Sequence, residues 1–138
     1  MSLRKNRPEA ERWLLAAAED LRAADYLYQA AMYAQCCLLA QQCGEKTLKA
    51  IWHLKGESPR GRSVERLLIE FPYLAEVASA QTWFEWARLL DRLSLAALSP
   101  MGLSDQSSMS TYPTHSAERA LDTARRLLED GRAWFDGH

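Results

Sequence analysis

Several features that would assign this chain to a special class of proteins are scarce or missing. The formal net charge is only −1 at pH 7, whereas a general nucleic-acid binder normally carries a clear basic excess. No apolar stretch approaches the length of a membrane span. The amino-terminal residues MSLRKNRPEAER also lack the apolar run of a signal peptide. We therefore expect a cytoplasmic protein that makes no contact with a membrane.

Cysteine is scarce too, and its spacing argues against both disulfides and zinc. The three cysteines are Cys36, Cys37 and Cys43, and all lie in one predicted helix. Cys36 and Cys43 would be roughly 10 Å apart along the helix axis, which is too far for a disulfide. No CxxC spacing is present, so a zinc site is not expected. We predict three buried thiols in a reducing compartment, with no metal and no cofactor.

What the sequence has in abundance is helix-forming residues with helical periodicity. Apolar residues recur at steps of three and four, and no segment shows the alternation of a strand. Pro8 fits the first turn of a helix, and Gly56, Pro72 and Pro100 fit helix ends. The pattern predicts helices over about 8–31, 33–55, 63–70, 81–99 and 116–135.

These segments predict an all-α fold, an up-and-down bundle of four to five helices in a single domain over residues 1–138. The third helix is short, and a long loop, about 100–115, precedes the last helix. A polar loop of that length is usually functional or disordered. Many facing residues of the first two helices are small, which favours a closely packed antiparallel hairpin.

A stripe of polar residues follows one side of the second predicted helix. Gln42, Lys46, Lys49 and His53 are spaced by four, three and four residues, so they share a helix face. Two lysines, an amide and an imidazole could bind a phosphate or an RNA backbone. The alternative is an ordinary solvated face, with Glu45 and Lys49 as an i,i+4 ion pair.

Asp20 stands in the step between Ala17 and Ala24, on the apolar face of the first helix. An unpaired buried carboxylate is costly, so we predict that Asp20 pairs with Lys46 or Lys49 on the second helix. The pair either joins the two helices or holds the lysines in place for a ligand.

Two motifs then suggest a family. The first predicted helix contains WxxxAxxDLxxA, and the second contains QQxxEKxLKA, which ends at a glycine. A proline-containing loop, the segment RSVERLL and a late Tyr–Pro pair follow. The residues that carry the pattern are Trp13, Ala17, Asp20, Leu21, Ala24, Gln41, Gln42, Glu45, Lys46, Leu48, Lys49, Ala50, Tyr112 and Pro113. Over about residues 13–130, the chain resembles the HEPN family (higher eukaryotes and prokaryotes nucleotide-binding domain).

The resemblance implies a helical bundle that is usually dimeric and is often paired with a small nucleotidyltransferase in toxin–antitoxin-like modules. Some members are metal-independent ribonucleases, with an arginine followed after four to six residues by a histidine near the dimer interface. Others are proposed to bind nucleotides without cleaving them. The five tryptophans and an alanine-rich surface also favour a homodimer, because they are more apolar material than a small bundle easily hides.

The sequence departs from the ribonuclease pattern. Arg62 stands where the family usually has a histidine, and Thr111 stands where it usually has the arginine of an Arg-Tyr-Pro turn. No arginine precedes His53 or His115 at the required spacing. Arg132 and His138 satisfy the spacing, but at the end of the last helix, where we expect mobility. We therefore assign no catalytic residue.

Three hypotheses remain. The first is a non-catalytic module that binds nucleotide or RNA phosphate through Lys46, Lys49 and Arg62, with Tyr112 near the base or sugar, and pairs with a nucleotidyltransferase. The second is a ribonuclease toxin with a non-standard site. The third is a helical dimerisation domain whose polar residues only mediate assembly. A cleavage assay on RNA separates the second from the others.

Overall fold

The computed structural model of the chain describes residues 3–98 and 112–138. In these ranges it contains no strand and confirms the all-α prediction. The helices are α1 (Leu3–Gln29), α2 (Tyr33–Leu54), α3 (Val64–Ile69), the 3₁₀ helix η1 (Leu74–Glu76), α4 (Ala80–Ala97) and α5 (Tyr112–Asp136).

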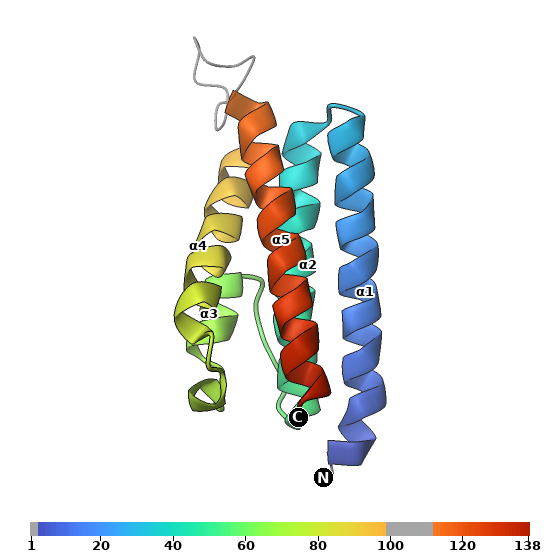
Figure 1. Cartoon of the computed structure of the whole chain (residues 1–138), viewed down its shortest axis with the longest axis vertical. Coiled ribbons are helices and arrows are strands. Elements are labelled where there is room, and N and C mark those ends of the chain that lie inside the picture. The colour runs from blue at the N-terminus through green and yellow to red at the C-terminus, as the bar shows by residue number, and fades with distance from the viewer. Residues whose placement is uncertain (1–2, 99–111) are drawn as a thin grey trace.

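The four long helices run alternately up and down, and α2 lies at the centre (Figure 1). Helices α1 and α2 form the expected antiparallel hairpin. Helix α2 also contacts α5, α4 and the short α3, and α3 packs against α4. The chain therefore places the polar stripe of α2 between α1 on one side and the α3–α4 layer on the other.

Two helix starts differ from the prediction. Helix α1 already includes Leu3, so Pro8 lies inside it and not in its first turn. A proline there removes one backbone hydrogen bond near the end of a long helix. Helix α5 begins at Tyr112, so His115, which we expected in the preceding loop, lies in the helix. The rest of the expected loop falls in 99–111, outside the described residues.

The inner face of α2 follows the helical spacing Cys36, Ala40, Cys43, Thr47, Ala50 and Leu54, and all six residues are buried. The first part of this face packs in the main core, and Ala50 and Leu54 pack in a second cluster with α1 and the end of α5. Cys36, Cys37 and Cys43 are free thiols with no exposed surface. Burial raises the pKa of Cys36 and Cys43 to about 12 and that of Cys37 to about 11, so all three are unreactive at neutral pH.

Glycine allows α2 to approach both α5 and α4 closely. A Cβ atom on Gly131 of α5 would lie 2.5 Å from Cγ2 of Thr47 on α2, and one on Gly44 of α2 would lie 2.8 Å from Cδ1 of Leu90 on α4. Both distances are far shorter than ordinary contacts, so these helices depend on having no side chain there. The rigid contact keeps the polar stripe of α2 in a fixed position relative to α5.

Candidate functional site

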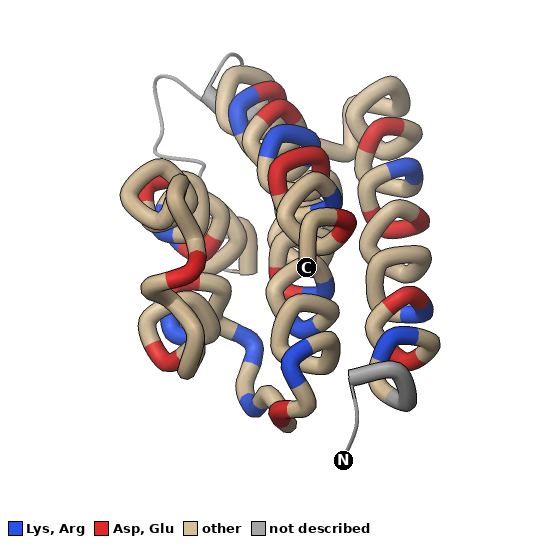
Figure 2. Tube along the Cα trace, turned by 60° about the horizontal axis from the view of Figure 1, so that its bottom comes forward, with Lys and Arg blue, Asp and Glu red and all other residues tan. Residues whose placement is uncertain are grey.

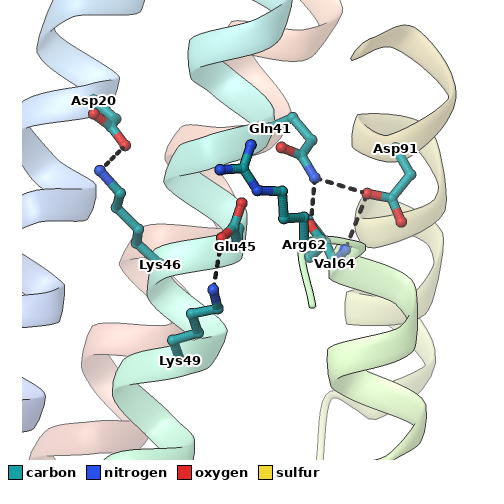
Figure 3. Close-up of polar contacts among 8 residues, drawn as sticks. All are labelled: Asp20, Gln41, Glu45, Lys46, Lys49, Arg62, Val64 and Asp91. Carbon is teal, nitrogen blue, oxygen red and sulfur yellow. Dashed lines mark hydrogen bonds and ion pairs between the residues drawn. The ribbon is translucent and has the colours of Figure 1, made fainter. Parts of the chain in front are cut away.

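The predicted ion pair between the first two helices is present. Nζ of Lys46 lies 2.8 Å from Oδ2 of Asp20, and their side chains are only 28% and 14% exposed. No hydrogen-bond donor besides Lys46 reaches the buried oxygen Oδ2 within the described part of the chain. The pair therefore joins α1 to α2, and the charge of Lys46 is taken up by Asp20 (Figure 3).

The second lysine of the stripe is also paired. Nζ of Lys49 lies 2.8 Å from Oε2 of Glu45, one turn earlier on α2, and the two side chains are 15% and 10% exposed. The i,i+4 pair of our alternative interpretation is therefore confirmed, but it is not part of a solvated face, since both side chains are largely buried. The same ammonium lies 5.5 Å from the ring centre of Trp13 on α1, a distance at which a cation and an aromatic face attract.

His53 lies at the end of the stripe and packs flat against α1. Its ring is stacked on that of Trp13, with centroids 5.7 Å apart and planes 10° from parallel. Burial lowers the pKa of His53, and the ammonium of Lys49 lowers it further, while the carboxylate of Glu9 acts in the opposite direction. The imidazole is therefore neutral at pH 7 and fills the α1–α2 contact.

Arg62 lies on the other flank of α2. Its side chain is exposed and reaches from the α2–α3 loop back over α2, with Lys46 on the α1 side and Asp91 on the α4 side (Figure 3). Its guanidinium has no ion pair among the described residues. Gln42 is half-buried on α2. The side chain of Tyr112 lies outside the described residues.

The backbone of Arg62 is held by a cluster that the sequence analysis missed. Asp91 of α4 accepts four hydrogen bonds: from Oγ of Ser63 (2.7 Å), from the backbone N–H of Val64 and of Glu65 (3.0 Å each), and from Nε2 of Gln41 (3.1 Å).

Gln41 also donates to the carbonyl oxygen of Arg62 at 2.7 Å. Asp91 therefore connects α2, α4 and the start of α3 at one point. The family motif contains two glutamines, and the sequence analysis chose Gln42 as the ligand residue. Gln41 is the one that positions Arg62.

A second polar surface lies between α4 and α5. It is an open groove of about 580 Å³, and Trp86, Arg88 and Arg92 of α4 line it together with Arg119 and Asp122 of α5. It was not predicted from the sequence, because the groove depends on which faces of α4 and α5 pack together. The spacing of Glu85, Trp86, Leu89 and Arg92 on one face of α4 was the available signal.

Arg132 and His138 have the spacing of the ribonuclease motif but face different neighbours. Nη1 of Arg132 lies 3.3 Å from Oε2 of Glu11 on α1. The ring of His138 is stacked on Trp134, 3.9 Å between centroids, and its Nδ1 lies 2.7 Å from the carbonyl oxygen of Trp134. Its Nε2 lies 3.8 Å from Oε1 of Glu76. These contacts place the ring of His138 beside Trp134 and Glu76, away from Arg132.

None of the helices that the structure describes has an apolar stretch that could cross a bilayer. Within the same residues, no group of three His, Cys, Asp or Glu side chains is placed to hold a metal ion.

Comparisons with known proteins agree with the resemblance seen in the sequence. The sequence model of the HEPN domain matches residues 10–134. The chain is similar to TT1696 from Thermus thermophilus, with 29% identity, a TM-score of 0.78, and coverage of 91% of this chain and 97% of that one. It is also similar to ST0689, an archaeal HEPN homologue, with 25% identity, a TM-score of 0.67 and the same coverage. No curated protein matches the chain.

Proposed function

This chain belongs to the HEPN domain family, and we propose that it acts as a non-catalytic module that binds the phosphates of a nucleotide or an RNA. The observation that supports this most is the state of its cations. Lys46 and Lys49 are already in ion pairs, whereas Arg62 is exposed and has no carboxylate within ion-pair distance among the described residues. A guanidinium of this kind can bind a phosphate through two parallel hydrogen bonds.

The lysines of the stripe and the nearby Arg62 then have different tasks. Lys46 and Lys49 fix the packing of α1 on α2, and Arg62 supplies the charge that attracts phosphate. The hydrogen bond from Gln41 to the Arg62 carbonyl keeps the backbone of this arginine next to α2. Figure 2 shows that the loop between α2 and α3 carries Lys and Arg positions, while α5 alternates basic and acidic ones.

The histidines favour binding over cleavage. Metal-free cleavage of RNA needs a histidine as acid or base and a cation at the same phosphate. His53 is stacked on Trp13, and Arg132 and His138 contact different elements. Neither His53 nor His138 therefore points at one place together with an arginine.

We further propose a cytoplasmic homodimer that pairs with a minimal nucleotidyltransferase in a toxin–antitoxin-like module. The tryptophans are no longer a reason for dimerisation, because each is buried or half-buried within the single chain. Exposed leucines support it instead: Leu95 and Leu98, near the end of α4, are 72% and 68% exposed. Light scattering should give the dimer mass, and Leu95→Glu should shift it to the monomer mass. A monomeric wild-type protein would refute the dimer.

Binding is tested with a fluorescent single-stranded RNA and with AMP as competitor, at about 50 mM and about 200 mM salt. We expect weak binding that falls as salt rises, because ions screen the attraction between phosphate and cation. Arg62→Gln should weaken it by roughly threefold or more. The matched control Arg22→Gln, an exposed arginine of α1, should change it little.

The other two hypotheses are outcomes of the same experiment. Degradation of RNA by the purified protein without metal would show a ribonuclease with a site not recognised here. A dimer that binds neither RNA nor AMP at low salt would show a structural dimerisation domain. Either result overturns the proposed function.

A further inference from the structure

The groove between α4 and α5 has the size of a nucleotide-binding site. Its volume of about 580 Å³ is within the usual range for small-ligand pockets, roughly 300–1,000 Å³. One wall is a single face of α4, on which Trp86 and Arg92 are separated by less than two turns, and Arg119 of α5 lies on the other wall. The side chains of the groove therefore come from two packed helices and not from a loop.

Two of the charged groups that line the groove, Arg88 and Asp122, have partners, whereas Arg92 and Arg119 do not within the described part of the chain. Arg88 pairs with Glu65 of α3 at 3.2 Å. Asp122 pairs with Arg126 at 2.9 Å on its own helix. Among the described residues, the exposed guanidinium groups of Arg92 and Arg119 have no ion pair and no hydrogen bond.

The acidic residue that remains on the wall is Glu85, so the free charge of the groove is positive. The α1–α2 contact shows the opposite arrangement, since both of its lysines are paired with carboxylates. The groove thus has cations available for an anionic ligand.

Trp86 gives the same groove an aromatic surface. Its indole is half-buried against the core and lines the cavity. No ring contact and no hydrogen bond of this indole occurs with the described residues, whereas Trp13, Trp52, Trp83 and Trp134 all have such contacts. A free indole face next to unpaired guanidinium groups is the combination that binds an unpaired base and its phosphate.

We infer that the α4–α5 groove binds one nucleotide unit, with its base against Trp86 and its phosphate between Arg92 and Arg119. This inference rests on the proposed function and moves its main site from Arg62 to the groove. The shared chemistry is an unstacked base that carries a phosphate, as in a free nucleoside monophosphate or in an unpaired nucleotide of RNA. A duplex does not fit this chemistry, because its bases are stacked and paired.

The test compares protein variants and ligands in one binding assay. The double variant Arg92→Gln, Arg119→Gln is measured against the control Arg22→Gln, Arg132→Gln, which removes the same charge outside the groove. The ligands are AMP, adenosine, ribose 5-phosphate, a short single-stranded RNA and an RNA duplex. Thermal melts of both variants confirm that they fold.

We expect the groove variant to lose about tenfold or more in affinity for AMP or single-stranded RNA and the control to lose less than about threefold. Adenosine and ribose 5-phosphate should each bind more weakly than AMP, since one lacks the phosphate and the other the base. If AMP and RNA both bind, a free nucleotide and an RNA nucleotide use the same groove. If only one of them binds, that one shows whether the ligand of the groove is a free nucleotide or a nucleotide within RNA.

Trp86→Leu keeps an apolar side chain of similar burial but removes the stacking surface, so it should weaken AMP binding by about fivefold or more. In the wild-type protein, AMP should shift the indole N–H resonance of Trp86 and leave that of the buried Trp83 unchanged.

Two results separate the inference from the proposed function. If the wild-type protein binds AMP or RNA and the groove variant binds equally well, the groove is not the site, while the proposed function stands with Arg62. If the wild-type protein binds no ligand at low salt, both are wrong.

Discussion

Two aspartates, each in the middle of a long helix among apolar residues, connect helices in different ways. Asp20 makes one ion pair with Lys46, across the α1–α2 contact. Asp91 accepts four hydrogen bonds, two of them from backbone N–H groups at the start of α3. The first connection depends on a single opposite charge, and the second depends on several donors fixed by the backbone.

The difference matters because the first N–H groups of a helix have no partner within the helix. Asp91 supplies that partner for α3 from another helix, and Ser63 caps the same turn by accepting from the N–H of Arg66 at 3.1 Å. Removing Asp91 therefore leaves several donors without acceptors. Removing Lys46 leaves one carboxylate without a cation. We expect the number of polar groups that lose their partner to determine how much stability each substitution costs.

Asp91→Ala should have the largest effect. It deprives the N–H groups of Val64 and Glu65 and the hydroxyl of Ser63 of their acceptor, and it removes one of the two acceptors of Gln41. Since an unsatisfied buried group costs about 1–3 kcal/mol, we expect the free energy of unfolding to fall by about 3 kcal/mol or more. Chemical denaturation measures this change.

Asp91→Asn is the matched control, because its carbonyl oxygen can still accept from the start of α3. It should lose less than half as much as Asp91→Ala. A loss below about 1 kcal/mol for Asp91→Ala would contradict the comparison, since it would mean that the four bonds contribute no more than one ordinary hydrogen bond.

Lys46→Met should have the next effect. It keeps the aliphatic stem in contact with α1 but leaves the buried Oδ2 of Asp20 without its cation. Because the two side chains are 28% and 14% exposed, part of the cost is screened by water, and we expect a loss of about 1–2 kcal/mol.

The double variant Asp20→Asn, Lys46→Met should recover part of that loss, since no unpaired charge remains. A double-mutant cycle over these variants gives the interaction energy of the pair. If the double variant is less stable than Lys46→Met alone, the carboxylate is stabilised by something other than Lys46.

The same two aspartates show what can be predicted from the sequence. The ion pair of Asp20 was predicted because helical spacing alone is enough to find it. A carboxylate between two small apolar positions must face a neighbouring helix, and that helix has lysines. Asp91 lies between Leu90 and Leu93, so it also needs a partner on a neighbouring element. Its partners, however, lie in the α2–α3 loop and on α2, and no periodicity predicts the path of a loop.

The α4–α5 groove was missed for a related reason. The helices themselves were predicted, with ends within a few residues for α2, α3 and α4, since their apolar steps are regular. The groove depends on which faces of α4 and α5 meet, and that is decided by the packing of both helices on α2, including the close contact of Gly131 with Thr47. Lys46 and Lys49 were correctly placed on one side of α2, and helical spacing named both carboxylates, but it did not decide which of the two lysines pairs with Asp20.

Lys49→Gln should have a smaller effect than Lys46→Met. Glu45 is buried, yet the pair lies within one helix, so its loss does not separate two elements. We expect a cost of about 0.5–1 kcal/mol, measured by denaturation, with Glu45→Gln, Lys49→Gln close to the wild type. If Lys49→Gln costs as much as Lys46→Met, the contact of its ammonium with Trp13 contributes more than we assume.

The smallest effect should come from the protonation of His53. Burial lowers its pKa in the folded protein from the value of 6.5 expected when it is free, so at acidic pH the unfolded chain binds the proton more readily than the folded one. The contribution of His53 to stability is therefore fully present above about pH 6.5. It is lost as the pH falls from there to the lower pKa of the folded state.

His53→Phe keeps a ring against Trp13 but cannot titrate, so its stability should decline less than that of the wild type between about pH 7.5 and about pH 5.5. Thermal melts of both proteins across this range measure the difference, and the other titrating groups cancel because the two share them. If the difference in stability between the two proteins stays constant with pH, α1 covers His53 without changing its pKa. In that case, the α1–α2 contact does not depend on pH through this residue.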